Sequence, residues 1–294
     1  MGAILRIVGR ALWYGVLFSI LGLVFFLNGW ILSFVARPVA PHAPLLGYAL
    51  EAALVLVGLS PPGQAVSAWL AGLRPLTTRQ RAYLLDALAD VRVATGYRGR
   101  VVLHIIHTPS VNACALGTRH VAVTEGWFWL PRGEQDAILA HELGHLSGRH
   151  SLLTGSLSLM STAGNWVGTL AVWIGFGLIL GGARTRRRGR GNAAVGVAAA
   201  LVAAATLLMS LVVWAMWSVY CRQSEYEADA YAARHGYRTA LASALARIGP
   251  TRYTGRSVTN AIWASHPATW RRLRRLARVV PPAMGRAPAL QRPL

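Results

Sequence analysis

Three long apolar runs constrain the fold of this chain of 294 residues. They extend over residues 11–35, 152–182 and 193–220, and each exceeds the about 20 residues that a helix needs to cross a lipid bilayer. A fourth run, residues 45–59, is shorter and contains Glu51, so it either crosses the bilayer or lies in its interface. We therefore expect a transmembrane helical bundle with about 3–4 spans.

The first apolar run follows Arg6 and Arg10, as the core of a signal peptide would. It is long, however, and no clean small-residue cleavage site follows it, so we expect an uncleaved membrane anchor. The overall composition agrees with membrane insertion, because 54% of the residues are hydrophobic and the mean hydropathy is +0.41.

The formal net charge of +20 would suit either nucleic acid or anionic lipid as a partner. No nucleic-acid-binding motif accompanies the charge. We therefore predict no nucleic-acid partner, and attraction to membrane lipids is the simpler explanation. The two cysteines, Cys114 and Cys221, have no zinc-ribbon spacing and indicate no disulfide framework.

Just before the second apolar run lies His141-Glu142-x-x-His145, which has the pattern H-E-x-x-H. On a helix the two histidines project from one face, so their imidazoles can bind a single Zn²⁺. Glu142 can then act as a general base on a water at the metal. Two acids just upstream fall in the expected first turn, where the helix dipole favours negative charge. The alternative is a helix with two surface histidines, since the pattern also recurs by chance.

Between the anchor region and this helix, the more polar sequence predicts a small region of mixed helix and sheet. We expect a helix over residues 79–95, capped by Thr77 or Thr78 and closed by Gly96. Short strands rich in apolar and β-branched residues are expected at 101–106, 112–117 and 120–124. A short aromatic segment follows at residues 125–130.

The second of these strands contains small side chains that would let a peptide backbone approach. An exposed strand edge can pair with an extended peptide. We therefore take four residues as candidates for substrate binding, namely Asn112, Ala113, Cys114 and Ala115. The alternative is a plain interior strand pair.

A catalytic zinc needs a third protein ligand, and the segment after the third apolar run offers carboxylates. Glu225 and Asp229 are four residues apart and share one helical face, whereas Glu227 lies about 200° from Glu225 around the helix. We assign Glu225 as the third ligand and Asp229 as the residue that orients a ligating imidazole. The alternative is a set of ordinary carboxylates on a helix surface.

The order of these motifs resembles that of the HtpX-like and CAAX-prenyl-protease-like membrane zinc metallopeptidases. The chain has His141-Glu142-x-x-His145, then a transmembrane hairpin, then Glu225-Tyr226-x-Ala228-Asp229. Weaker matches are Val111-Asn112-Ala113, similar to the family's substrate-side N-A motif, and Ser265-His266-Pro267 with Arg272, similar to its late H-P…R segment. The resemblance extends over residues 75–280 or so.

The resemblance implies a zinc endopeptidase with one Zn²⁺ per chain, bound by His141, His145 and Glu225. Glu142 would take the proton of the attacking water and pass it to the leaving amine. The expected substrates are peptides or membrane proteins, in quality control or processing.

Two late residues, His266 and Arg272, are candidates to face the oxyanion that develops during hydrolysis. The alternative for Arg272 is that it anchors its own helix. The chain departs from the family pattern at Cys221, where serine is usual, and at the arginine-rich hairpin tip, residues 184–190. Neither departure removes a candidate ligand.

The implied fold class is α+β and helix-rich, with a zincin-type metallopeptidase domain that contains a small sheet and is fused to the transmembrane bundle. We expect five segments in order: an N-terminal anchor region with one or two spans (1–62), the first part of the peptidase domain with the H-E-x-x-H helix (63–151), a transmembrane hairpin (152–220), the second part of the peptidase domain with the third zinc ligand (221–280), and a tail (281–294).

The sequence leaves two alternatives to the peptidase function. One is a catalytically inactive membrane scaffold, and the other is a sensor-type membrane metallopeptidase that cleaves a regulatory target. We expect the inner or plasma membrane of a bacterial-type cell, with the catalytic domain facing the cytoplasm, on the resemblance more than on charge. Arginines flank both sides of the expected spans, so the positive-inside rule does not settle the orientation. The oligomeric state does not follow from the sequence.

Overall fold

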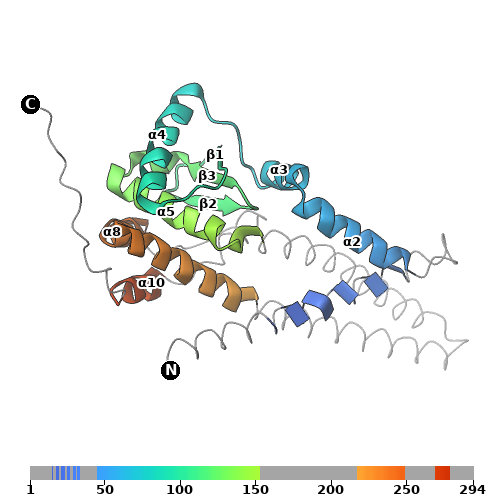
Figure 1. Cartoon of the computed structure of the whole chain (residues 1–294). Coiled ribbons are helices and arrows are strands. Elements are labelled where there is room, and N and C mark those ends of the chain that lie inside the picture. The colour runs from blue at the N-terminus through green and yellow to red at the C-terminus, as the bar shows by residue number, and fades with distance from the viewer. Residues whose placement is uncertain are drawn as a thin grey trace, which may run out of the picture. The chain divides into compact units, whose positions relative to one another are not determined.

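The computed structural model describes residues 45–152, 217–248 and 269–278, together with separate helical positions between 15 and 33 (Figure 1). By its internal contacts the chain divides into two compact units. One unit contains residues 1–63 and 155–219, and the other contains residues 64–154 and 220–294. Most of the three long apolar runs lies outside the described residues, so the expected transmembrane bundle stays a prediction.

The helix α2 (Leu46–Leu59) belongs to the expected anchor region, and α3 (Pro61–Leu70) begins at the end of that region and continues into the expected peptidase domain. Among the residues that the structure describes, no single helix is both long enough and apolar enough to cross a bilayer. α2 and α3 meet that requirement only when they are taken together, and the pair is bent by 82° at the break between them.

The helix α4 (Thr78–Thr95) begins and ends as the sequence predicts. The Thr77 hydroxyl accepts a hydrogen bond from the backbone N–H of Gln80, while the Gln80 side chain accepts one from the backbone N–H of Thr77. This reciprocal capping box satisfies two N–H groups that a helix start leaves without partners. At the other end Gly96 has a φ of 66°, a conformation that glycine adopts without strain. The buried residues of the helix are Leu84, Ala87, Leu88, Val91 and Thr95.

The sheet has three strands, β1 (Val102–Ile106), β2 (Ala113–Leu116) and β3 (His120–Thr124). Their order is β1-β3-β2, with β3 parallel to β1 and antiparallel to β2. At the outer side of β1, the backbones of Arg74 and Ile105 exchange hydrogen bonds of 2.8 and 2.9 Å. Among the described residues β2 pairs with β3 alone, so β2 lies at an edge of the sheet.

Both faces of the sheet are covered. Val121 and Val123 of β3 belong to the main core, which also contains the buried residues of α4 and α5 (Arg132–Ser147). The residue between them, Ala122, belongs to a second cluster on the opposite face, with Ala68 and Leu73. The helix-rich α+β architecture with a small sheet, predicted from the sequence, is therefore confirmed.

The helix α5 is buried along most of its length and follows the 3-10 helix η1 (Glu125–Trp129). Its polar side chains have partners in this buried position. Gln135 accepts a hydrogen bond from the Tyr83 hydroxyl at 2.7 Å and donates one to the Trp127 carbonyl at 3.2 Å. Glu134 accepts hydrogen bonds of 3.0 and 3.2 Å from Arg247 on α8 (Arg238–Ile248). These bonds fix α5 between its neighbours, so its histidines are held on a rigid element.

Candidate metal centre

The helix α5 brings His141 and His145 together on one buried face. Their Nε2 atoms are 3.2 Å apart, and the two rings meet edge to face with centroids 4.8 Å apart. When each ring carries its proton on Nδ1, both Nε2 atoms present lone pairs to each other. A cation between them would satisfy both lone pairs.

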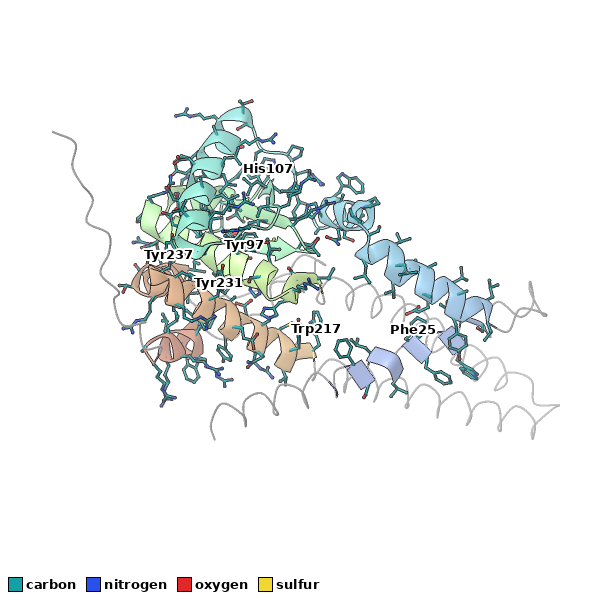
Figure 2. All side chains as sticks on the ribbon, viewed as in Figure 1. Phe25, Tyr97, His107, Trp217, Tyr231 and Tyr237 are labelled. Atoms are coloured by element: carbon teal, nitrogen blue, oxygen red, sulfur yellow. The ribbon has the colours of Figure 1, made fainter. Side chains whose placement is uncertain are left out.

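Gly144, which lies between the two histidines in sequence, permits a close approach of a second helix. A side-chain carbon at position 144 would lie 3.0 Å from the Cα atom of Ala228 and 3.1 Å from the Cβ atom of Tyr231. Tyr231, labelled in Figure 2, belongs to the helical segment of residues 217–232. The missing side chain at Gly144 therefore lets this segment lie directly against the H-E-x-x-H turn.

The same segment places Glu225 at the two histidines. Glu225 Oε1 is 3.2 Å from His145 Nε2, and Glu225 Oε2 is 3.4 Å from His141 Nε2. Glu227, two residues later, instead contacts His150, with Glu227 Oε2 3.0 Å from His150 Nε2. Glu225 and Glu227 thus point in different directions from one helix, as the 3.6-residue period requires.

The two histidines and Glu225 are close enough together to bind one zinc ion. With zinc–nitrogen and zinc–oxygen bonds of about 2.0–2.1 Å, two ligand atoms lie about 3.3–3.4 Å apart. The two Nε2 atoms are 3.2 Å apart, and each lies 3.2–3.4 Å from a different oxygen of the Glu225 carboxylate, Oε1 for His145 and Oε2 for His141. Within the described part of the chain, His141, His145 and Glu225 are the one group of three potential ligands with atoms within 4.8 Å of one another. The residues present therefore fit a zinc ion.

Asp229 and Arg272 lie next to this group and contact it. Asp229 Oδ1 is 3.0 Å from His141 Nδ1, so the carboxylate can hold the proton on Nδ1 and leave Nε2 free for a metal. Arg272, on α10 (Thr269–Leu276), donates hydrogen bonds of 2.6 and 2.9 Å to the two Asp229 oxygens. Its Nη1 atom lies 3.0 Å from Glu225 Oε2.

The ionisation of Asp229 follows from these contacts. Burial alone would raise the pKa of Asp229, but the Arg272 charge and the hydrogen bond with His141 outweigh it and lower the pKa to about 2. Asp229 therefore stays an anion and can orient His141 over the whole physiological pH range.

Glu142 is also buried on α5, the helix that packs against the edge strand β2. Burial, and after it the negative charge of Glu142, raises the pKa of Cys114 on β2 to about 12. Cys114 is therefore a neutral thiol at physiological pH. The same interaction indicates that β2 lies close to Glu142, with the small side chains of Ala113 and Ala115 on either side of Cys114.

Residues 75–280 match peptidase family M48. The match extends over more than half of the chain. The chain belongs to peptidase family M48. The predicted resemblance to HtpX-like zinc metallopeptidases is thereby confirmed.

Curated proteins similar to this M48 chain include proteins named as proteases. The Protease HtpX homolog of Aeropyrum pernix is 41% identical over 155 residues, which is 51% of this chain and 46% of that protein. The Protease HtpX homolog of Nostoc sp. is 34% identical over 157 residues, 51% of this chain and 51% of that protein. The chain thus spans about half the length of the curated relatives that it matches. The crystal structure of S. mikatae Ste24p has a TM-score of 0.47 and 18% identity, and covers 91% of this chain and 64% of that chain.

The two candidates for the oxyanion differ in what the structure describes of them. His266 lies outside the described residues of this M48 chain. Arg272 is buried, and its guanidinium is occupied by the carboxylates of Asp229 and Glu225. These contacts favour a role in positioning the carboxylates over the oxyanion role considered for Arg272.

One histidine beside the M48 site, His150, was not expected from the sequence. Its ring meets the His145 ring edge to face at a centroid distance of 5.9 Å. Arg149, with a φ of 54°, turns the chain after α5, and His150 follows it. Glu227 holds His150 from the other side. The sequence contains no signal for this pair beyond the closeness of His150 to the H-E-x-x-H motif.

Proposed function

We propose that this chain is a membrane-embedded, zinc-dependent metalloendopeptidase that hydrolyses peptide bonds in membrane-protein quality control or processing. The observation that carries the proposal is the grouping of His141, His145 and Glu225, whose potential ligand atoms lie within 4.8 Å of one another, while Glu142 is buried one residue from His141. Family membership supports the same chemistry.

The bound zinc ion would polarise the scissile carbonyl and make a water more acidic. His141, His145 and Glu225 would hold the ion. The Glu142 carboxylate would accept the proton of the attacking water and then transfer it to the nitrogen of the leaving amine. Because Glu142 projects from the helix one step round from His141, it serves as a base without being a ligand.

The edge strand β2 would hold the substrate in an extended form. Asn112, Ala113, Cys114 and Ala115 are the candidates, because β2 is an edge strand of small residues and the charge of Glu142 acts on Cys114. Main-chain hydrogen bonds to an edge strand recognise a peptide with little dependence on its sequence. This arrangement suits a broad range of unfolded peptide substrates.

Metal removal tests the proposed activity. Purified full-length protein in detergent should hydrolyse an unfolded protein such as casein, lose that activity on treatment with a zinc chelator, and regain it when zinc is added back. A catalytically inactive scaffold would show no hydrolysis in any of these states. Hydrolysis that persists after complete removal of the metal would contradict the zinc mechanism.

We infer that Arg272 stabilises the site, because its guanidinium neutralises the two buried carboxylates of Asp229 and Glu225. Replacing Arg272 by methionine should destabilise the protein by about 3–5 kcal/mol, because Asp229 and Glu225 would remain buried without their cation. Thermal unfolding in detergent measures the loss. The matched control is Arg274→Met, at an exposed position of the same helix, which should unfold close to the wild-type temperature. Equal unfolding temperatures for Arg272→Met and the wild type would refute this role.

We propose that the catalytic unit faces the cytoplasm from the inner or plasma membrane. In that topology the arginine-rich tip, residues 184–190, lies outside. A cysteine introduced at Gly189, in a variant lacking Cys114 and Cys221, should then react with an impermeant thiol reagent in intact cells. Labelling that requires lysis of the cells would place the tip inside and the zinc site outside.

A further inference from the structure

The helix α3 exposes its apolar side and buries its polar side. Gln64 and Ala68 are 4% and 2% exposed, whereas Val66, Trp69 and Leu70 are 56%, 62% and 70% exposed. The three exposed side chains have i, i+3 and i+4 spacing and therefore share one face of the helix. In a water-soluble domain the opposite burial is usual, with a glutamine side chain exposed and a tryptophan side chain buried. The exposed face of α3 is therefore suited to an apolar environment.

The buried side of α3 is fixed to the turn between β2 and β3. Gln64 Oε1 accepts hydrogen bonds from the backbone N–H and the hydroxyl of Thr118, at 2.9 and 3.0 Å. Gly117 has a φ of 62°, and a side-chain carbon at this position would lie 2.4 Å from Gln64 Oε1. On its other side the Gly117 carbonyl accepts a hydrogen bond of 2.7 Å from Ser151, next to the second apolar run. The turn that ends β2 is thus attached to α3 and to the start of an apolar run.

The C-terminal end of α3 has residues typical of a membrane interface. The Arg74 guanidinium lies 5.8 Å from the centre of the Trp69 ring and donates hydrogen bonds to the carbonyls of Trp69 and Leu73. Tryptophan is enriched at the boundary between headgroups and acyl chains, and arginine there reaches anionic headgroups. The formal net charge of +20 adds to that attraction.

The preceding helix α2 has the same reversed burial. Glu51 is 1% exposed, whereas Leu50, Leu54 and Leu56 are 48%, 54% and 68% exposed. Taken by itself, each of the two helices therefore exposes apolar side chains and buries a polar one. An apolar environment at the exposed face would account for this in each helix.

We propose that α3 is an interfacial helix whose Val66, Trp69 and Leu70 lie in the boundary between headgroups and acyl chains of the bilayer. Through Gln64 the helix holds the turn at Gly117 and Thr118, and so the end of β2, at the membrane surface. The helix α3 would lie at the membrane surface whether or not the chain is an active peptidase. If β2 binds substrate as proposed above, an extended peptide would reach it directly from the membrane surface.

Spin labels measure the environment of α3 directly. Cysteines are introduced singly at Val66, Trp69 and Leu70 in a full-length background with Cys114 and Cys221 replaced by alanine. The labelled protein is reconstituted into phosphatidylethanolamine–phosphatidylglycerol vesicles, and accessibility to oxygen and to a water-soluble nickel complex is compared. The matched control is Val93→Cys on α4, because Val93 is an apolar side chain 86% exposed on a helix of the same unit.

At all three α3 positions the ratio of oxygen to nickel accessibility should be severalfold higher than at position 93, with a mobile label spectrum. Nickel accessibility equal to that at position 93 would show that α3 faces water and would overturn the proposal. An immobilised label that neither reagent reaches would show that protein covers this face, and would overturn it equally. Unfolding temperatures identify any cysteine variant that does not fold. Each variant that does fold tests the proposal in the same way.

Discussion

Replacement of Glu142 by glutamine is expected to lower the rate of peptide hydrolysis by about 10²–10⁴-fold while zinc remains bound. The amide has nearly the shape of the carboxylate but cannot accept the proton of the attacking water. Zinc should remain because the three donor atoms that fit the ion belong to other residues, His141, His145 and Glu225. Casein hydrolysis and zinc content are measured on the same purified preparation.

A matched control for this change is Asp136→Asn, which makes the same acid-to-amide substitution on the same helix. Asp136 contacts Arg132 at 3.0 Å and takes no part in the donor group, so this variant should hydrolyse casein close to the wild-type rate. A Glu142→Gln variant with full zinc and wild-type activity would show that another group acts as the base. A Glu142→Gln variant without zinc would show that Glu142 contributes to metal binding.

Substitutions at Glu225 and Glu227 should have different effects on zinc binding, although the two acids are two residues apart on one helix. Glu225→Ala is expected to remove most of the zinc, because one of three ligands is lost and the buried Arg272 loses one of its carboxylates. Glu227→Ala should keep nearly all of it, since Glu227 contacts His150 and Gln223 and is not one of the three potential ligands. Zinc per chain is measured after dialysis against the same buffered free zinc.

Asp229→Ala should lie between these two variants. It leaves the three donor atoms in place but removes the partner of His141 Nδ1, and losses of this kind are commonly about 10–100-fold in metal affinity. Equal zinc loss in the Glu225 and Glu227 variants, or loss in the Glu227 variant alone, would contradict the assigned register of this helix.

The local signals in the sequence predicted the elements that surround the site. Thr77 and Gly96 determine where α4 begins and ends through a side-chain cap and a left-handed residue, and both effects involve only near neighbours in the chain. The strand at 120–124 likewise matches β3 because its β-branched and apolar residues are contiguous. Such features need no knowledge of the rest of the fold.

Pairings between distant segments could not be predicted in the same way. The central position of β3, parallel to β1, depends on a crossover and on the packing of both sheet faces. Leu85 has the same chemistry as its neighbour Leu84, yet Leu85 is 47% exposed and Leu84 is buried, because α5 covers only one side of α4. Helical spacing indicates a face but does not determine its width.

The same difference between local features and long-range contacts applies to the candidate metal centre. Spacing along one helix predicted that His141 and His145 share a face, and that Glu225 and Asp229 share another. The contact between these helices depends on Gly144, which leaves room for Ala228. The sequence alone does not show that these two residues are neighbours. Arg272 is a similar case, because its two carboxylate partners lie 43 or more residues away in sequence. No sequence spacing indicates an ion pair of that kind.

X-ray absorption at the zinc edge, together with the zinc content of the purified full-length protein, tests the central claim most directly. We expect about one zinc per chain, with nitrogen and oxygen ligands at about 2.0–2.1 Å that include two imidazoles, and with no sulfur ligand. The absence of sulfur follows from the group of potential ligands, His141, His145 and Glu225, which contains no cysteine. A folded chain that binds no zinc at micromolar free metal, or one whose zinc has a sulfur ligand at about 2.3 Å, would contradict the metal centre described above.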